Sequence, residues 1–108
     1  MAKFVMVVQS KAQPGRDDEY NQWYDDVHFG DICAVPGVTG GRRLNYTMSI
    51  MGEPGLPYLA LYEVETDDIG ATMAEMGRRG AAGEMAISDA LDAPASVFWV
   101  YQVQDGYE

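Results

Sequence analysis

The spacing of hydrophobic and polar positions changes several times along this chain, and each change predicts a new element. A β-branched run at residues 4–9 lacks polar alternation, which predicts a strand covered on both faces. A second set of positions recurs at helical spacing and predicts a first helix over residues 17–34. Its members are Tyr20, Trp23, Tyr24, Val27 and Asp31.

The middle of the chain predicts a hairpin. Gly40-Gly41 interrupts the chain before residues 43–51, where apolar and polar side chains alternate as in a half-buried strand. A turn rich in glycine and proline at residues 52–57 then leads into an aromatic and aliphatic run at residues 58–64. These two runs are therefore expected to pair.

The last third of the chain predicts a helix and a final strand. Residues 66–68 offer N-cap chemistry for a second helix, whose end is obscured by several glycines. A further short helix is expected at residues 84–91. Residues 96–103 alternate two apolar sets and predict the last strand.

The resulting order of strand, helix, strand, strand, helix, strand predicts an α+β, ferredoxin-like βαββαβ fold. In this fold a four-stranded antiparallel sheet carries its helices on one face. The first and last strands are apolar on both sides, so the second face is expected to meet a second copy of the chain in a homodimer. Without repeats or linkers, residues 1–108 are expected to form a single domain.

Charge and cysteine content exclude several classes of partner. The net charge of −10, from 17 acidic and 7 basic residues, opposes binding to nucleic acid and to anionic membranes. The lone Cys33 excludes an internal disulfide framework and suits a reducing compartment. The apolar N-terminal run is too short to span a bilayer. We therefore expect a soluble cytoplasmic protein.

The single histidine, His28, is the best candidate for chemistry, because imidazole exchanges protons near neutral pH. On a helix, Tyr24 and Asp31 lie four residues before and three residues after it, so the three side chains can converge as a catalytic group. Asp31 would then orient the imidazole. In the alternative interpretation, His28 lies at the helix edge and Asp31 supports the turn at residues 35–37.

Several other side chains are candidates for substrate binding. Tyr46 and Tyr62 carry phenols that need a polar partner when buried, and Trp23 belongs to the same aromatic set. Arg43 could bind a carboxylate or phenolate, although the simpler interpretation is a solvated strand residue that balances the acidic surface. Most of the aromatic residues are expected to be core.

The residue content gives little support for a metal or a cofactor. One histidine and one cysteine cannot form a structural zinc site, and the glycines do not match a nucleotide-binding loop. We expect no metal and no cofactor, with haem as a minor alternative for which His28 is the only good axial ligand.

Residues 20–38, followed by Gly41-Arg42-Arg43, resemble the first helix and following strand of EthD-type dimeric α+β barrel proteins. That family joins an aromatic helix carrying a histidine to a Val-Pro-Gly turn and an Arg-bearing strand. The resemblance implies a ferredoxin-like subunit, a homodimer with its sheets packed face to face, and a pocket between sheet and helices. The resemblance does not decide the activity of this chain, because proteins with this fold have many different activities.

Two functional hypotheses remain. In the first, the protein is a small cofactor-independent lyase or isomerase, of dehydratase or cyclase type, in which His28 transfers a proton on an apolar, aromatic or lactone-like molecule. In the second, the protein is a non-catalytic accessory protein that binds a hydrophobic metabolite of a catabolic or biosynthetic pathway.

Overall fold

The computed structural model describes residues 1–107, and its elements follow the predicted order. They are β1 (Ala2–Ser10), α1 (Asp17–Trp23), η1 (Tyr24–His28), α2 (Phe29–Cys33), β2 (Val38–Asn45), β3 (Tyr58–Thr66), α3 (Ile69–Ala81), η2 (Ala93–Ala95) and β4 (Val97–Gln102). The elements α1, η1 and α2 follow one another without a gap and form one long helical segment, which agrees with the first predicted helix.

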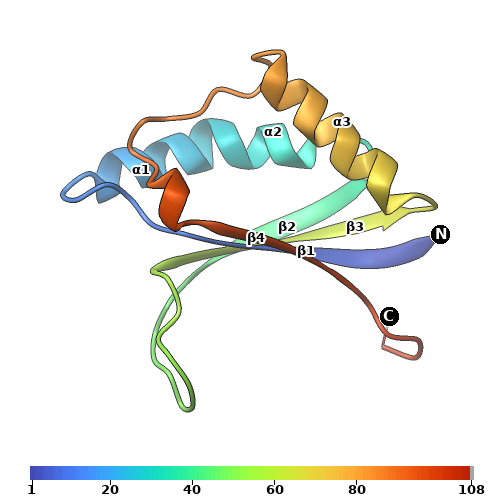
Figure 1. Cartoon of the computed structure of the whole chain (residues 1–108), viewed down its shortest axis with the longest axis horizontal. Coiled ribbons are helices and arrows are strands. Elements are labelled where there is room, and N and C mark those ends of the chain that lie inside the picture. Colours follow the sequence, from blue (N-terminus) through green and yellow to red (C-terminus); the bar gives the residue numbers. More distant parts are fainter. Residues whose placement is uncertain (108) are drawn as a thin grey trace.

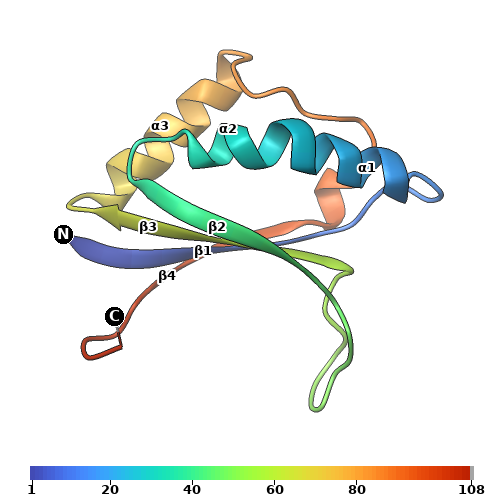
Figure 2. The ribbon, with the colours of Figure 1, turned by 180° about the vertical axis from the view of Figure 1, so that it is seen from behind.

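The four strands form an antiparallel sheet in the order β2-β3-β1-β4, and the helices cover one of its faces (Figures 1 and 2). The expected α+β, ferredoxin-like fold is therefore confirmed. The core lies between the central strands and the helical layer, where Met6, Tyr62 and Tyr20 are each 0% exposed. No helix among residues 1–107 has the length and apolar content needed to cross a membrane.

No helix among the described residues covers the opposite face of the sheet, which we call the open face (Figure 1). Successive strand residues point to opposite faces, so the strand register identifies the side chains on it. Its apolar members are Val5, Val7, Leu44, Leu59, Leu61, Val97, Trp99 and Tyr101. Trp99 and Tyr101 remain 44% and 59% exposed, so this face presents aromatic surface to water.

The second strand begins earlier than predicted. The sequence predicts a strand over residues 43–51, whereas β2 spans Val38–Asn45 and includes both Gly40 and Gly41. Glycine is needed at position 41 for packing: a Cβ atom there would lie 2.8 Å from Cδ1 of Tyr62 and 2.9 Å from the carbonyl oxygen of Leu61. Gly41 therefore marks a close contact inside a strand, and the Gly-Gly pair is not a turn.

Residues 46–57 form a long connection between β2 and β3, which we call the arm. The arm projects from the sheet on the side away from the helices (Figures 1 and 2). The alternating residues that predicted a strand lie here without a partner strand, because β2 and β3 pair only as far as Asn45 and Tyr58. As a result, Met48, Ile50 and Met51 are 69%, 96% and 93% exposed.

The short helix predicted at residues 84–91 is wrong. This segment is irregular, and its end pairs with the residues after β1 through an isolated bridge between Ala12 and Leu91. The backbone N–H of Gln13 donates to the carbonyl of Ala90 at 2.7 Å, which competes with helix formation. Gly83, with a φ of 75°, ends the preceding helical region.

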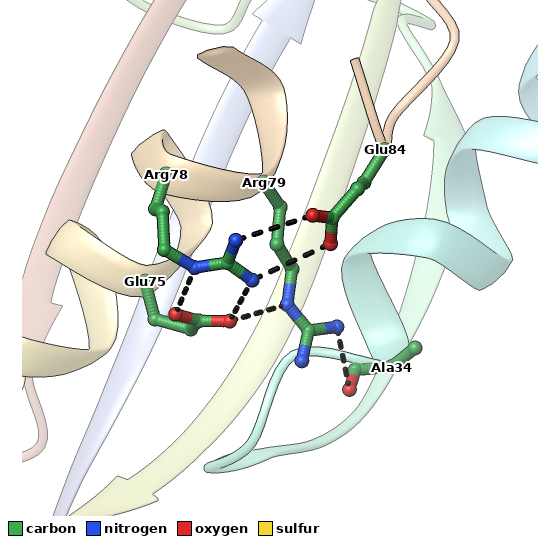
Figure 3. Close-up of polar contacts among 5 residues, drawn as sticks. All are labelled: Ala34, Glu75, Arg78, Arg79 and Glu84. Atoms are coloured by element: carbon green, nitrogen blue, oxygen red, sulfur yellow. Dashed lines mark hydrogen bonds and ion pairs between the residues drawn. The ribbon is translucent and has the colours of Figure 1, made fainter. Parts of the chain in front are cut away.

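Helix α3 begins at the predicted cap, where Asp68 accepts a hydrogen bond from the N–H of Ala71. Near the other end of α3, Glu75 binds both Arg78 and Arg79, and Arg78 also binds Glu84 (Figure 3). Arg79 then donates to the carbonyl of Ala34 at 3.3 Å (Figure 3). This network links α3 to the residue that follows α2.

Replacing Gly41 with alanine should destabilise the fold by about 1–3 kcal/mol, because the added methyl group overlaps Tyr62 and the β3 backbone. Gly40→Ala is the matched control, since its Cβ would meet no atom within 4 Å. Urea unfolding of both variants measures the difference. Equal free energies of unfolding for the two would contradict the packing role of Gly41.

Candidate functional site

The long helical segment contains one wide turn, at Tyr24–His28. There the backbone N–H of Phe29 donates to the carbonyl of Tyr24, five residues earlier, as in a π-helix. This π-turn holds one residue more than a regular turn. Every later residue is therefore rotated by about 100° from the position that a regular helix would give it.

The rotation changes which side chains face the sheet. The sequence places Val27 and Asp31 on the buried stripe, but Val27 is 38% exposed and Asp31 is only half-buried. Their places are taken by the next residues: His28 faces inward and Ile32 is only 5% exposed. The predicted stripe is therefore wrong after Tyr24, and the extra residue of the π-turn is the physical reason.

A cavity of about 290 Å³ lies between this helical segment, the end of β1 and the start of β4. It is lined by Val8, Ser10, Trp23, Tyr24, His28, Leu91, Ala93, Ser96, Val97 and Phe98. Most of these side chains are apolar, and none is an acid, lysine or arginine. The volume is at the low end of the range of about 300–1,000 Å³ for small-molecule pockets, which favours a small uncharged ligand.

His28 is held in the cavity wall by two aromatic rings. Its imidazole stacks on the indole of Trp23, with centroids 4.6 Å apart, and meets the ring of Tyr24 edge-on at 4.9 Å. Trp23 is fixed in turn by a hydrogen bond of 2.9 Å from its indole N–H to the carbonyl of Ala86. Among the described residues, Nδ1 of His28 is buried and has no hydrogen-bond partner.

Burial lowers the pKa of His28 below its ordinary value. The negative charge of Asp31 opposes this effect and the positive charge of Arg43 adds to it, but burial is the larger cause. The imidazole is therefore neutral at pH 7 and can accept a proton.

Tyr24 and Tyr62 form a buried pair of phenols, with their hydroxyl oxygens 2.7 Å apart. Burial raises the pKa of Tyr24 to about 12 and also raises the pKa of Tyr62, so both hydroxyls keep their protons. Tyr24 lines the cavity, whereas Tyr62 lies behind it in the core. When Tyr62 donates to Tyr24, the hydroxyl hydrogen of Tyr24 is free to point at a ligand.

Arg43 lies beside the site but outside the cavity lining. Its terminal nitrogens bind Asp25 at 2.8 Å and Asn21 at 2.9 Å, and its guanidinium carbon is 4.3 Å from the ring centroid of Tyr24. Arg43 therefore contacts the wall residue Tyr24, and each of its terminal nitrogens already binds another side chain. Its buried Nε has no hydrogen-bond partner in the described part of the chain.

Two other candidates lie away from the cavity lining. The carboxylate of Asp31 makes no hydrogen bond to His28 within residues 1–107, and its effect on the imidazole is through charge. Tyr46 lies at the start of the arm, and its hydroxyl pairs with that of Ser49 at 2.8 Å. Of the seven candidates, the structure thus brings Trp23, Tyr24 and His28 together in the cavity wall.

Sequence reasoning missed the polar residues contributed by the strand ends. Ser10 ends β1 and hydrogen-bonds the hydroxyl of Tyr20, while Ser96 precedes β4 and donates to the carbonyl of Asp92. The ferredoxin-like order contains a usable signal, because antiparallel β1 and β4 place these two ends side by side. Among residues 1–107, no group of three or more His, Cys, Asp and Glu side chains is placed to hold a metal ion.

Because the chain has one histidine, its protonation can be followed without ambiguity by NMR titration of the imidazole Cε1 proton. We expect a pKa below about 6.5, the ordinary value. The unfolded chain then binds more protons than the folded one, so stability falls as the pH drops from about 6.5 toward the folded pKa. Urea unfolding should show this loss, and His28→Gln should lack it. A folded pKa above the ordinary value would contradict the burial argument.

Comparisons with known proteins agree with this geometry at the level of the fold. No protein-family model matches the chain, and no curated protein matches it in sequence. Several solved structures match nearly its whole length, and three of them are described below. An EthD family protein from Bacillus halodurans is 15% identical, with a TM-score of 0.63, and the match covers 96% of this chain and 100% of that one.

The haem degrader MhuD from Mycobacterium tuberculosis, solved with two haems in its active site, is 13% identical, with a TM-score of 0.64 and coverage of 93% of this chain and 94% of that one. A candidate monooxygenase from Shewanella loihica is 15% identical, with a TM-score of 0.61 and coverage of 95% of each chain. The resemblance to EthD-type proteins inferred from the first helix is therefore confirmed as a shared ferredoxin-like fold.

Proposed function

We propose that this protein is a small lyase or isomerase that uses His28 to move a proton on an apolar, aromatic or lactone-like molecule without a cofactor. One observation carries the proposal: a neutral imidazole with an unpartnered Nδ1 stands in the wall of a mostly apolar cavity. A buried polar atom without a partner is uncommon in folded proteins and is often explained by a functional role.

The neutral state of His28 suits it to begin the reaction as a general base. When it takes a proton from the substrate, the new positive charge is favoured by Asp31, whose charge raises the pKa of the imidazole. Asp31 acts here through the electric field and not through a hydrogen bond. Trp23 keeps the ring orientation by stacking on it.

Tyr24 is the proposed donor to the oxygen on which negative charge develops. The Tyr24 side chain lines the same cavity as His28, and its hydroxyl keeps its proton and is paired with that of Tyr62. In this mechanism Tyr62 and Arg43 are positioning residues, since both contact Tyr24 from outside the cavity. The base and the donor thus stand on adjacent parts of one wall.

The cavity does not fit a haem. Among the described residues that line the cavity, none is a lysine or arginine that could pair with the two propionates of the tetrapyrrole. His28 is therefore assigned to proton transfer and not to axial ligation.

A second candidate function is ligand binding without turnover, as in a carrier for a hydrophobic metabolite. It is favoured by the absence, within the described chain, of any hydrogen bond between His28 and a carboxylate. A binding protein needs the apolar cavity and the Tyr24 hydroxyl but no proton acceptor.

A Kemp elimination tests the base directly. In 5-nitrobenzisoxazole, a base removes the ring C–H proton, the C–H electron pair completes a nitrile, and the N–O bond breaks to leave a coloured phenolate. The parent protein should accelerate this ring opening, and His28→Ala should lower the rate by about 10²–10⁴-fold, the usual contribution of a general base. Tyr24→Phe should lower it less.

Gln22→Ala is the control for this experiment, because Gln22 is exposed on the same helical segment. Equal rates in the parent and His28→Ala would remove His28 from the mechanism. Binding without any rate above that of buffer, seen as quenching of Trp23 fluorescence that is lost in Trp23→Phe, would support the carrier instead.

We further propose that the protein is a cytoplasmic homodimer in which two open faces pack together. The apolar strand residues supply the contact, and the face carries two positive charges, Lys3 and Arg42, and two negative charges, Glu63 and Glu65. A face with balanced charge can meet its own copy despite a net charge of −10. The unpaired Cys33 is compatible with a reducing compartment.

Light scattering tests the dimer. The parent should have twice the chain mass of 11.9 kDa, and Trp99→Asp should be monomeric because it places an unpaired charge among the apolar residues of the open face. Ile87→Asp, at an exposed apolar residue outside the sheet, should remain dimeric. A monomeric parent at micromolar concentration would overturn this proposal.

A further inference from the structure

The arm exposes more apolar surface than a solvent-facing connection needs. Ile50 and Met51 at its tip are almost fully exposed, and Glu53 is the only charged residue among residues 46–57. Single exposed apolar residues are common, but a contiguous group of them marks an interaction surface.

The arm also has a defined shape. At its base, the N–H of Tyr46 donates to the carbonyl of Pro57 at 2.9 Å, and the N–H of Leu56 donates to the side chain of Gln9 at 3.0 Å. Within the arm, the hydroxyls of Ser49 and Tyr46 are hydrogen-bonded to each other. The Ser49 hydroxyl also lies 3.4 Å from the carbonyl oxygen of Glu53, to which it can donate. These bonds hold the apolar tip away from the sheet from which it rises (Figure 2).

The arm and the ligand cavity occur at the same end of the sheet but on opposite faces. The register pairs Asn45 with Tyr58, Ser10 with Tyr58 and Gln9 with Val97, so β1 and β2 end where β3 and β4 begin. The cavity is on the helix side of this end, next to β4, whereas the arm leaves from the other side. An arm is therefore directed away from the cavity of its own chain.

In a dimer whose two open faces pack together about a two-fold axis parallel to the strands, the arm of one copy is directed toward the other copy. This axis places the β2 edge of one copy over the β4 edge of the other and keeps the same ends of the sheets together, because the order is β2-β3-β1-β4. Packed sheets are about 10 Å apart. Five extended residues, somewhat less than half of the arm, reach about 16 Å. The tip thus extends past the second sheet at its β4 edge.

The β4 edge offers a matching apolar surface at this point. Phe98 and Val100 belong to the helix side of β4 but are still 45% and 39% exposed. Phe98 also lines the cavity, so the wall of the cavity is open to solvent on this side. No residue of β4 is charged, and an apolar tip would meet no repulsion there.

We propose that the arm of each copy packs its tip against β4 of the second copy and closes that copy's ligand cavity beside Phe98. The inference rests on the proposed dimer and ligand cavity and adds that each cavity is complete only in the presence of the second copy.

Disulfide crosslinking tests this contact without a substrate. In a Cys33→Ala background, Ile50→Cys is mixed with Phe98→Cys, subunits are allowed to exchange, and the mixture is mildly oxidised and run on a non-reducing gel. The major product should be a disulfide-linked dimer that contains one copy of each variant. Val100→Cys replaces Phe98→Cys in a second mixture, in case the loss of the phenyl ring prevents folding.

The control mixture combines Ile87→Cys with Val100→Cys, because Ile87 is also an exposed apolar residue but lies outside the arm. Crosslinking no greater than in this control would overturn the proposal, and a dimer found by light scattering would then still stand. The crosslink does not depend on turnover, so the arm contact can be confirmed even if His28→Ala retains full activity.

Discussion

The hydrogen bond from the N–H of Phe29 to the carbonyl of Tyr24 determines what the rest of the helical segment can do. Because this turn contains one extra residue, the segment buries Tyr20 and Tyr24 against the sheet in its first part and Ile32 in its last part. A regular helix would have buried Val27 and Asp31 instead. The imidazole reaches the cavity wall because of this extra residue, and the carboxylate is moved to the side for the same reason.

The cavity wall is built from neutral groups although the chain is strongly acidic. Two of the acids near the site bind other side chains: Asp25 binds Arg43, and Asp17 accepts from the hydroxyl of Tyr58 at 2.5 Å. Arg43 packs against Tyr24 and also stands 5.7 Å from the ring centroid of Tyr20. Charged groups thus lie around the rings of Tyr20 and Tyr24 but do not line the cavity. The cavity wall therefore has low polarity, which favours the neutral form of His28.

The sequence could predict the order of elements, since strands and helices differ in hydrophobic period and the Asp68 cap has a local signature. It could also identify His28 as the best candidate for proton transfer. It could not place β2 correctly, because the reason for Gly41 is a close contact with Tyr62, about twenty residues later. The irregular segment before β4 was equally hidden, since its structure depends on pairing with Ala12 near the other end of the chain.

The least predictable feature was the π-turn, because helix propensity and periodicity contain no term for an inserted residue. Its effect was to exchange two pairs of neighbours, Val27 with His28 and Asp31 with Ile32. The predicted cluster of Tyr24, His28 and Asp31 therefore survives only in part, as a direct contact between Tyr24 and His28 and a longer-range effect of Asp31.

The composition of β4 has a consequence for handling the protein. Val97–Gln102 is an edge strand without a charged residue, a proline or a glycine, and such a strand can recruit another chain into cross-β aggregation. The acidic remainder of the molecule keeps separate chains apart by electrostatic repulsion at neutral pH. Acidification toward the pKa of the carboxylates, or high salt that screens them, removes this colloidal protection and leaves precipitation to compete with native assembly.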